Sequence, residues 1–298
     1  MISSSATSLR ALVTGAGGQV GRALQDTVPD GVILHAMPSM ALDITDSEAV
    51  QSTIDRLCPD VIINAAAYTA VDRAESEPEL AYRVNRDGAA NLAMAGHRQG
   101  ARIIHISTDY VFDGKHDQPY APDATCHPIG VYGASKRAGE VAVLEHGGAG
   151  ATVVRTSWVH SSTGSNFVRT MLRLMAERHE LRVVDDQVGR PTWAGGLAEA
   201  LWAMATRPAS VDVAHWADAG VTTWHGLAEA TLEGALERGL LNRRVDVHAV
   251  PTAEFPTPAP RPRFSVLDIS SAKAVFGREP AHWRDTLSLM LEELCRAA

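Results

Sequence analysis

Short apolar runs alternate with amphipathic stretches along the first half of the chain. Runs rich in Val, Ile and Leu, bounded by turn residues, are typical of strands buried on both faces of a parallel sheet. Such runs cover residues 9–14, 32–34, 60–64, 102–107 and 151–156. Apolar residues at helical spacing lie between them, at about 20–24, 47–57, 79–99 and 131–144. Because strand and helix alternate, we predict an α/β fold with a doubly wound parallel sheet and right-handed crossovers.

The second half of the chain has a mixed pattern. Residues 251–262 are rich in proline, which fixes φ and removes a backbone donor, so we expect an extended loop there. Helical spacing recurs at 167–178, 223–238 and 283–294, and 181–184 is typical of a strand. These features predict a smaller α/β lobe after the sheet domain.

Composition and charge narrow the class of protein. The chain has 298 residues and a net charge of -8, which argues against binding to nucleic acid or to an acidic membrane. Cys58, Cys126 and Cys295 form no C-x-x-C pair, so we expect neither a disulfide framework nor a zinc site. Residues 1–8 lack the features of a signal peptide, and no apolar run is long enough to span a bilayer. We therefore expect a cytoplasmic protein.

Glycines three residues apart join the first predicted strand to the first predicted helix. They are Gly15, Gly18 and Gly21, within Thr-Gly-Ala-Gly-Gly-Gln-Val-Gly. A tight turn needs a residue without Cβ, and a pyrophosphate needs close approach to bare backbone at a helix N-terminus. In a strand–turn–helix context this spacing predicts a Rossmann-type dinucleotide site that includes Gln19 and Val20. The alternative is a glycine-rich turn without a ligand.

The form of the dinucleotide depends on the end of the second strand. An acidic residue there binds the adenosine ribose, whereas a nearby arginine accommodates a 2′-phosphate. Residues 35–39 contain neither. We therefore expect weak discrimination, with both NADH and NADPH in use.

Tyr132 and Lys136 stand four residues apart in a segment with helical spacing. That spacing puts both side chains on one face, so the phenol and the ammonium can enter one cleft. A nearby positive charge would lower the pKa of the phenol from about 10 and make it an acid near neutral pH. Ser107 and Thr108 end the fourth strand, at the edge where open α/β sheets bind ligands. Each residue alone also suits a strand-end turn or an exposed helix, but together they predict an oxidoreductase with a tyrosine proton donor.

These motifs resemble those of the dTDP-4-dehydrorhamnose reductases, a family of extended short-chain dehydrogenase/reductases. The most specific segments are Ser-Thr-Asp-Tyr-Val-Phe at 107–112 and Phe-Pro-Thr-Pro-Ala at 255–259. Further matching segments lie at 18–21, 64–72, 74–76, 131–133, 155–159, 166–167, 186–187 and 191–192. The resemblance covers nearly the whole chain. It implies a dinucleotide-binding domain at 1–160 and a mainly substrate-binding lobe at 161–298, with some segments returning to the first domain.

The resemblance also implies an activity and a set of site residues. The activity is reduction of a 4-keto sugar nucleotide by NADPH or NADH, with Tyr132 as proton donor to the C4 oxygen. Lys136 would bind the nicotinamide ribose, and Thr108 would bind the reacting oxygen. The implied cofactor contacts are Gly15, Gly18, Gln19, Val20, Gly21, Asp43, Ile44, Ala67, Tyr68, Thr69, Ser107, Tyr132 and Lys136. The implied substrate contacts are Thr108, Asp109, Trp158, Asn166 and Arg261.

Other roles suit some of these residues equally. Asp43 would also serve as an N-terminal cap for the helix at 47–57. Trp158 ends an apolar strand, where core packing is the alternative. Arg261 suits a diphosphate because its donors form a planar fork, and a solvated surface charge is the alternative.

The chain departs from the family at several positions. Some members are magnesium-dependent dimers, which leaves a homodimer open for this chain. The positions expected to hold that metal are Ala23 and Gly195, with Glu293 as the remaining acid, so we expect no metal site. His160 stands where a tyrosine is usual.

Two other functions remain open from the sequence. One is a non-catalytic dinucleotide-binding subunit of the kind that regulates methionine adenosyltransferase, which the intact Thr-Tyr-Lys set disfavours. The other is a sugar-nucleotide dehydratase or epimerase. Dehydratases need an extra acid beside the catalytic threonine, and Asp109 follows Thr108. The local sequence therefore leaves both the reductase and the dehydratase open. The proline-rich loop favours the reductase.

Overall fold

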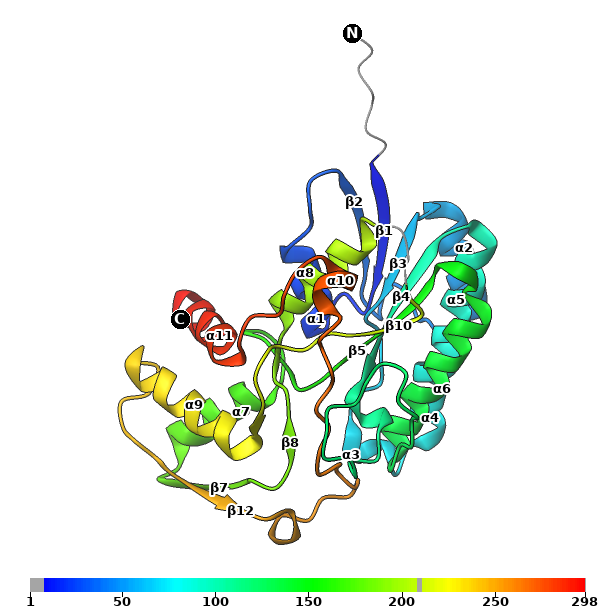
Figure 1. Ribbon diagram of the computed structural model, residues 1–298. Helices are drawn as coiled ribbons and strands as arrows, with labels where there is room; N and C mark the ends of the chain where they lie inside the picture. Colours follow the sequence, from blue (N-terminus) through cyan, green and yellow to red (C-terminus); the bar gives the residue numbers. More distant parts are fainter. Residues whose placement is uncertain (1–7, 208–210, 298) are drawn as a thin grey trace.

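The computed structural model describes residues 8–207 and 211–297 of the chain. A parallel sheet of six strands forms the centre of the larger part of the molecule (Figure 1). The spatial order is β10-β5-β4-β3-β1-β2, and every neighbouring pair is parallel. The strands are β1 (Leu9–Thr14), β2 (Val32–Met37), β3 (Val61–Asn64), β4 (Arg102–Thr108), β5 (Ala151–Thr156) and β10 (Val213–His215). The predicted Rossmann-type α/β fold is confirmed.

Helices cover both faces of this sheet, which explains why its strands are apolar throughout. Successive strand residues point to opposite faces, so Val13 packs into the core on one side and Leu12 into the core on the other. The first face is covered by α1 (Gln19–Asp26), α8 (Ala194–Ala205) and α10 (Ala272–Phe276). The second face is covered by α2 (Ser47–Leu57), α5 (Ala89–Gln99) and α6 (Val131–His146).

In the smaller part of the described chain, helices pack around short strands (Figure 1). Its elements are β6 (Val159–His160), α7 (Phe167–Glu177), β7 (Glu180–Val184), β8 (Val188–Gly189), β9 (Thr192–Trp193), β11 (Thr222–Thr223), α9 (Trp224–Glu237), β12 (Asp246–Val250) and α11 (Trp283–Ala297). Parallel pairing joins β12 to β7 and β6 to β9, and β11 runs antiparallel to β8. The division of the chain at residue 160 stays a prediction. Three elements after that residue lie with the large sheet: β10 is one of its strands, and α8 and α10 pack on one of its faces.

Several expectations need correction at the level of single elements. The helix expected at 79–99 is three consecutive segments, α4 (Pro78–Tyr82), the π-helix η1 (Arg83–Gly88) and α5. The proline-rich loop contains a short 3₁₀ turn, η4 (Thr252–Glu254). The pattern analysis missed α8, because a helix buried on nearly all sides has no polar face to reveal its period.

The membrane and N-terminal expectations have different outcomes. Within residues 8–207 and 211–297, no helix is both long and apolar enough to cross a membrane. The expectation about a signal peptide concerns residues 1–8, of which 1–7 lie outside the described part of the chain.

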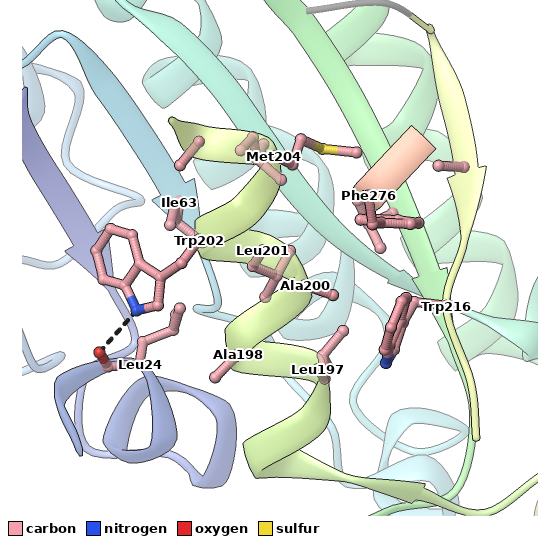
Figure 2. Close-up of a cluster of buried hydrophobic side chains, with 14 of the residues drawn as sticks. Leu24, Ile63, Leu197, Ala198, Ala200, Leu201, Trp202, Met204, Trp216 and Phe276 are labelled. Carbon is pink, nitrogen blue, oxygen red and sulfur yellow. Dashed lines mark hydrogen bonds between the residues drawn. The ribbon is translucent and has the colours of Figure 1, made fainter. Parts of the chain in front are cut away.

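Trp202 on α8 connects the two helices that lie side by side on the first face. Its indole is 2% exposed, and its Nε1 donates a hydrogen bond of 3.0 Å to the Leu24 carbonyl of α1. Figure 2 shows this bond and the neighbouring side chains, among them Ile63 and Leu201. The tryptophan therefore anchors α8 to α1.

We expect Trp202→Ala to lower the free energy of unfolding by about 3 to 5 kcal/mol, because it leaves a large cavity in a packed core. Urea unfolding followed by circular dichroism measures the change. Leu289→Ala is the matched control, since Leu289 is 45% exposed and its truncation should change the free energy by less than about 0.5 kcal/mol. Equal effects of the two substitutions would contradict this account of the core.

Candidate active site

A cleft of about 510 Å³ opens at the carboxyl ends of the central strands. Its walls come from both parts of the chain, since they include the glycine turn, the end of β4, the start of α6 and the N-terminal residue of α9. Residues that line it are Gly18, Gln19, Val20, Ala67, Thr69, Ser107, Thr108, Asp109, Tyr132, Lys136, Trp158, Asn166 and Trp224, among others. Most of the residues singled out in the sequence therefore meet in one place.

The glycine turn presents bare backbone to this cleft. Gly15 has a φ of 68°, and a Cβ there would lie 2.5 Å from the Ala66 amide nitrogen, so only glycine fits. Gly18 is the N-terminal cap of α1 and has no side chain to satisfy the first amides of the helix. Helix amides left unpaired in this way can bind a phosphate group.

The loop that follows β3 is held against α6 by Asn85. The Asn85 side chain accepts a bond of 2.8 Å from the Tyr68 amide and donates bonds to the Tyr68 carbonyl and the Ser135 hydroxyl, at 3.1 and 2.9 Å. Asn85 is 1% exposed and lies in the π-helix, a distortion common at functional sites. The sequence analysis missed it, and the only signal was an amide residue inside an otherwise helical stretch.

Tyr68 itself is placed differently from its neighbours. Its hydroxyl donates a bond of 2.6 Å to Glu77, and the cleft is lined by Ala67 and Thr69 rather than by Tyr68. Tyr68 therefore lies outside the wall of the cleft.

Tyr132 and Lys136 lie on one face of α6, as the spacing predicts, and both line the cleft. The Tyr132 ring packs edge-on against Tyr110 with 5.6 Å between ring centroids. Lys136 is 2% exposed, and its Nζ donates a bond of 2.6 Å to the Ile106 carbonyl and lies 3.4 Å from His105 Nε2. Burial lowers the pKa of His105 well below its usual value, so this imidazole is neutral.

The expected lowering of the Tyr132 pKa is wrong for this structure. Burial raises the pKa of Tyr132 to about 12, and a hydrogen bond with Thr108 opposes that rise only in part. The Lys136 ammonium does not offset it, because it is bonded to the Ile106 carbonyl instead of the phenol. Burial lowers the pKa of Lys136 itself to about 8, against an opposing effect of the Glu140 carboxylate.

Three polar side chains at the end of β4, those of Ser107, Thr108 and Asp109, are buried. Thr108 Oγ1 donates a bond of 3.0 Å to Asp109 Oδ1 and accepts one of 3.2 Å from the Tyr110 amide. Among the described residues, Ser107 Oγ and Asp109 Oδ2 have no hydrogen-bond partner although both are buried. Burial also raises the pKa of Asp109 to about 6. Glu140 lies beside Ser107 and Ser265 lies beside Asp109, so protein side chains face both of these groups.

Two tryptophans from distant parts of the sequence stack in the wall of the cleft. Trp158 and Trp224 have centroids 3.6 Å apart and planes 8° from parallel. Trp158 has a φ of 48°, which is rare for a bulky residue and is found mostly where a site requires it. It also packs against the core cluster around Trp283, so it both lines the cleft and fills the core. Trp224 was missed because nothing in its local sequence connects it to residues near 158.

Asn166 and Gln19 form a contact between the two parts of the chain. Asn166 Nδ2 donates bonds of 2.8 Å to Gln19 Oε1 and to the Ser161 carbonyl, and its Oδ1 caps α7 by accepting from the Arg169 amide. The Ser161 hydroxyl also donates to Gln19 Oε1, at 2.9 Å. The Asn166 amide is thus already bonded within the protein.

Arg261, Asp43 and Ile44 lie outside the cleft wall. Arg261 pairs with Asp72 at 2.9 Å in a neighbouring cavity of about 280 Å³, which shares the side chains of Phe167 and Trp224 with the cleft. The Asp43 carboxylate accepts from the Thr45 amide and hydroxyl, whereas Asp46 caps α2. The alternative of Asp43 as the helix cap is therefore wrong.

Ala23, Gly195 and Glu293 line one cavity of about 250 Å³, together with Asp26. The first two positions supply no ligand atoms from their side chains. In residues 8–207 and 211–297, no group of three or more His, Cys, Asp or Glu side chains is arranged to hold a metal ion. Asp26 and Glu293 are the carboxylates that line this cavity, so the absence of a metal site stays a prediction.

The parallel sheet, the glycine turn and the Thr-Tyr-Lys set in the cleft together define an oxidoreductase of the extended short-chain dehydrogenase/reductase class. Residues 9–296 match the family described as RmlD substrate binding domain, and the chain belongs to that family. It is 43% identical to a dTDP-4-dehydrorhamnose reductase of Streptomyces griseus, over 97% of this chain and 95% of the relative. It is 45% identical to one of Mycobacterium tuberculosis, over 95% of this chain and 92% of the relative.

Solved structures agree with this membership. The crystal structure of dTDP-4-dehydrorhamnose reductase from Bacillus anthracis, in complex with NADP, superposes with a TM-score of 0.90 at 36% identity. The comparison covers 96% of this chain and 99% of that one. The family resemblance drawn from the sequence motifs is confirmed.

We expect Gly189→Ala to displace the tryptophan stack, because a Cβ at this position would lie 2.6 Å from Trp158 ring atoms. Stacked indoles couple electronically, so the loss should appear as a weaker exciton signal in far-ultraviolet circular dichroism. Gly196→Ala is the control, since its Cβ would meet no atom closer than 3.7 Å. A full signal in Gly189→Ala would show that the stack tolerates the added carbon.

Proposed function

We propose that this protein reduces the C4 keto group of dTDP-4-dehydro-L-rhamnose to give dTDP-L-rhamnose, with NADPH or NADH as the hydride donor. The observation that carries the proposal is the convergence of Thr108, Tyr132 and Lys136 in one cleft, beside a glycine turn. Relatives of 43% and 45% identity carry the name of this reductase. Incubation with dTDP-4-keto-6-deoxyhexose, an epimerase and NADPH, followed by product analysis, tests it.

The residues present fit a dinucleotide. The cleft offers bare backbone at Gly18 and unpaired amides at the start of α1. Ala67 and Thr69 belong to the wall of the same cleft. When it is bound, the nicotinamide supplies the hydride that reduces C4.

Tyr132 provides the matching proton in this proposal. A carbonyl becomes an alcohol when hydride adds to carbon and a proton adds to oxygen, so a protonated group must face the oxygen. With a pKa of about 12, the Tyr132 phenol is protonated throughout the neutral range, as a proton donor requires. Thr108 would bond the same oxygen once its hydroxyl hydrogen turns away from Asp109, and Lys136 would hold the nicotinamide ribose through the ammonium protons that the Ile106 carbonyl leaves free.

In this proposal the substrate occupies two cavities, the cleft and the neighbouring cavity that contains Arg261. Asp109 and the Trp158 ring contact the sugar in the cleft, and Asn166 acts beside them by fixing Gln19 and the start of α7. The neighbouring cavity with Arg261 receives the nucleotide diphosphate, because a guanidinium fork matches phosphate oxygens.

We also infer a cytoplasmic location for the protein. A homodimer stays a prediction, and light scattering of the purified protein checks it.

A dehydratase is the second candidate, because Asp109 is a buried acid beside Thr108. Its pKa of about 6 would let it exchange protons near neutral pH. Reduction consumes one dinucleotide per product, whereas dehydration regenerates its cofactor in each cycle. Stoichiometric loss of nicotinamide absorbance therefore supports the reductase, and product formed without that loss supports the dehydratase.

We expect Tyr132→Phe to lower kcat by about 10² to 10⁴-fold, the usual effect of removing a general acid. The ring stays in place, so the substrate Kd should change little. Single-turnover absorbance at saturating dinucleotide measures the chemical step. More than half of the normal rate in this variant would contradict Tyr132 as the proton donor.

We expect NADH affinity to fall as the pH rises through about 8. Lys136 has a lowered pKa of about 8, so its ammonium is present below that pH and lost above it. Calorimetric titration of NADH from pH 6.5 to 9.5 measures the effect, with the ordinary lysine pKa of about 10.4 for comparison. Lys136→Met should bind NADH weakly and without this dependence, and an identical slope in both proteins would assign the titration to another group.

A further inference from the structure

A second cavity lies on the other side of the glycine turn, at the carboxyl end of β2. Its volume is about 520 Å³, and its walls include Ala16 and Gly17 of the turn, Pro38 after β2, and Arg22 of α1. The Ala16 amide donates a bond of 3.2 Å to the Met37 carbonyl, so the turn and the end of β2 are joined at this cavity. Because neighbouring residues of one turn line both spaces, a dinucleotide whose pyrophosphate lies at Gly18 directs its adenosine half toward the second cavity.

Arg22 is oriented in this cavity without being neutralised. Its Nε donates a bond of 3.0 Å to the Gly17 carbonyl, which draws the side chain back over the turn. Among residues 8–207 and 211–297, no carboxylate lies within 4.0 Å of the guanidinium, and its two terminal nitrogens have no hydrogen-bond partner. Asp26, one turn further along α1, lines the same cavity but forms no ion pair with Arg22.

Such an arrangement suits a phosphate monoester better than a hydroxyl. A guanidinium offers donors in a planar fork, and pairs with phosphate are shorter and stronger than neutral hydrogen bonds. Fixing Nε beforehand reduces the side-chain freedom lost when a ligand binds. In Rossmann domains the ribose of the adenosine lies at the end of the second strand, where an arginine accommodates a 2′-phosphate.

Resting on the proposed reductase function, we propose that Arg22 binds the 2′-phosphate of NADPH and makes NADPH the preferred cofactor. Residues 35–39 contain neither an acid nor an arginine, so α1 supplies the cation that β2 lacks. The expectation of weak discrimination considered only the end of β2. In the folded chain, Arg22 of α1 lines the same cavity as Pro38 at the end of β2, so we now expect a preference for NADPH over NADH.

Binding of two fragments tests the proposal without any turnover. Calorimetry compares 2′,5′-ADP with 5′-ADP, which differ only in the 2′-phosphate. We expect wild-type protein to bind 2′,5′-ADP about 10 to 100-fold more tightly, the range for hydrogen bonds to charged groups. In Arg22→Gln the two fragments should bind alike, because 2′,5′-ADP alone loses affinity, and Arg22→Lys should keep part of the preference.

Arg56→Gln is the matched control, because it removes the same charge from an exposed position on α2. It should keep the full preference for 2′,5′-ADP. A preference that survives in Arg22→Gln, or is absent from the wild type, overturns the proposal.

Turnover then separates this proposal from the proposed function. If the protein reduces its substrate, Arg22→Gln should raise the KM for NADPH by the same factor and leave kcat and the KM for NADH unchanged. If the fragment preference depends on Arg22 but no sugar nucleotide is reduced, the reductase function fails and the 2′-phosphate site stands.

Discussion

A buried cation constrains the centre of this structure. The Lys136 ammonium is 2% exposed, and a charge held in such a place is costly unless protein groups compensate for it. The Ile106 carbonyl bonds it directly at 2.6 Å, and the Glu140 carboxylate acts on it from the next turn of α6. Glu140 is in turn held by the Arg155 guanidinium through two bonds of 2.8 Å. This arrangement sets the register of α6 against β4 and β5.

The position of Tyr132 follows from that register. One turn of helix separates it from Lys136, so a helix fixed by its lysine also carries the phenol to the end of β4, next to Thr108. On the sheet side, the Thr14 hydroxyl and Asn64 extend the same network, since Asn64 accepts from Thr14 at 2.8 Å and faces His105 Nδ1 at 3.0 Å. Because His105 is neutral, its ring adds no second positive charge beside Lys136. The reactive groups are therefore positioned by buried polar contacts between α6 and the sheet.

The second part of the chain completes the site by covering this centre. The Trp158–Trp224 stack and the Gln19–Asn166 contact both join elements that are distant in sequence. They give the cleft an apolar wall opposite the polar end of β4, an arrangement that suits one face of a sugar ring. The two cavities beside the cleft contain Arg22 and Arg261, and the cleft contains Asp109, so charges of both signs lie at the site although the net charge of the chain is -8.

The sequence by itself determined the features that depend on local spacing. Strand and helix periods predicted the sheet, the three glycines predicted the turn, and four-residue spacing put Tyr132 and Lys136 on one face, because backbone geometry alone decides each of these. The tertiary structure decided what depends on distant neighbours. Asn85 and Trp224 contact residues that approach them only in the fold, and the cavity at Arg22 forms only where α1 meets the end of β2. The pKa of Tyr132 moved opposite to the expectation because burial and the direction of the Lys136 ammonium, which no spacing rule contains, determine its sign.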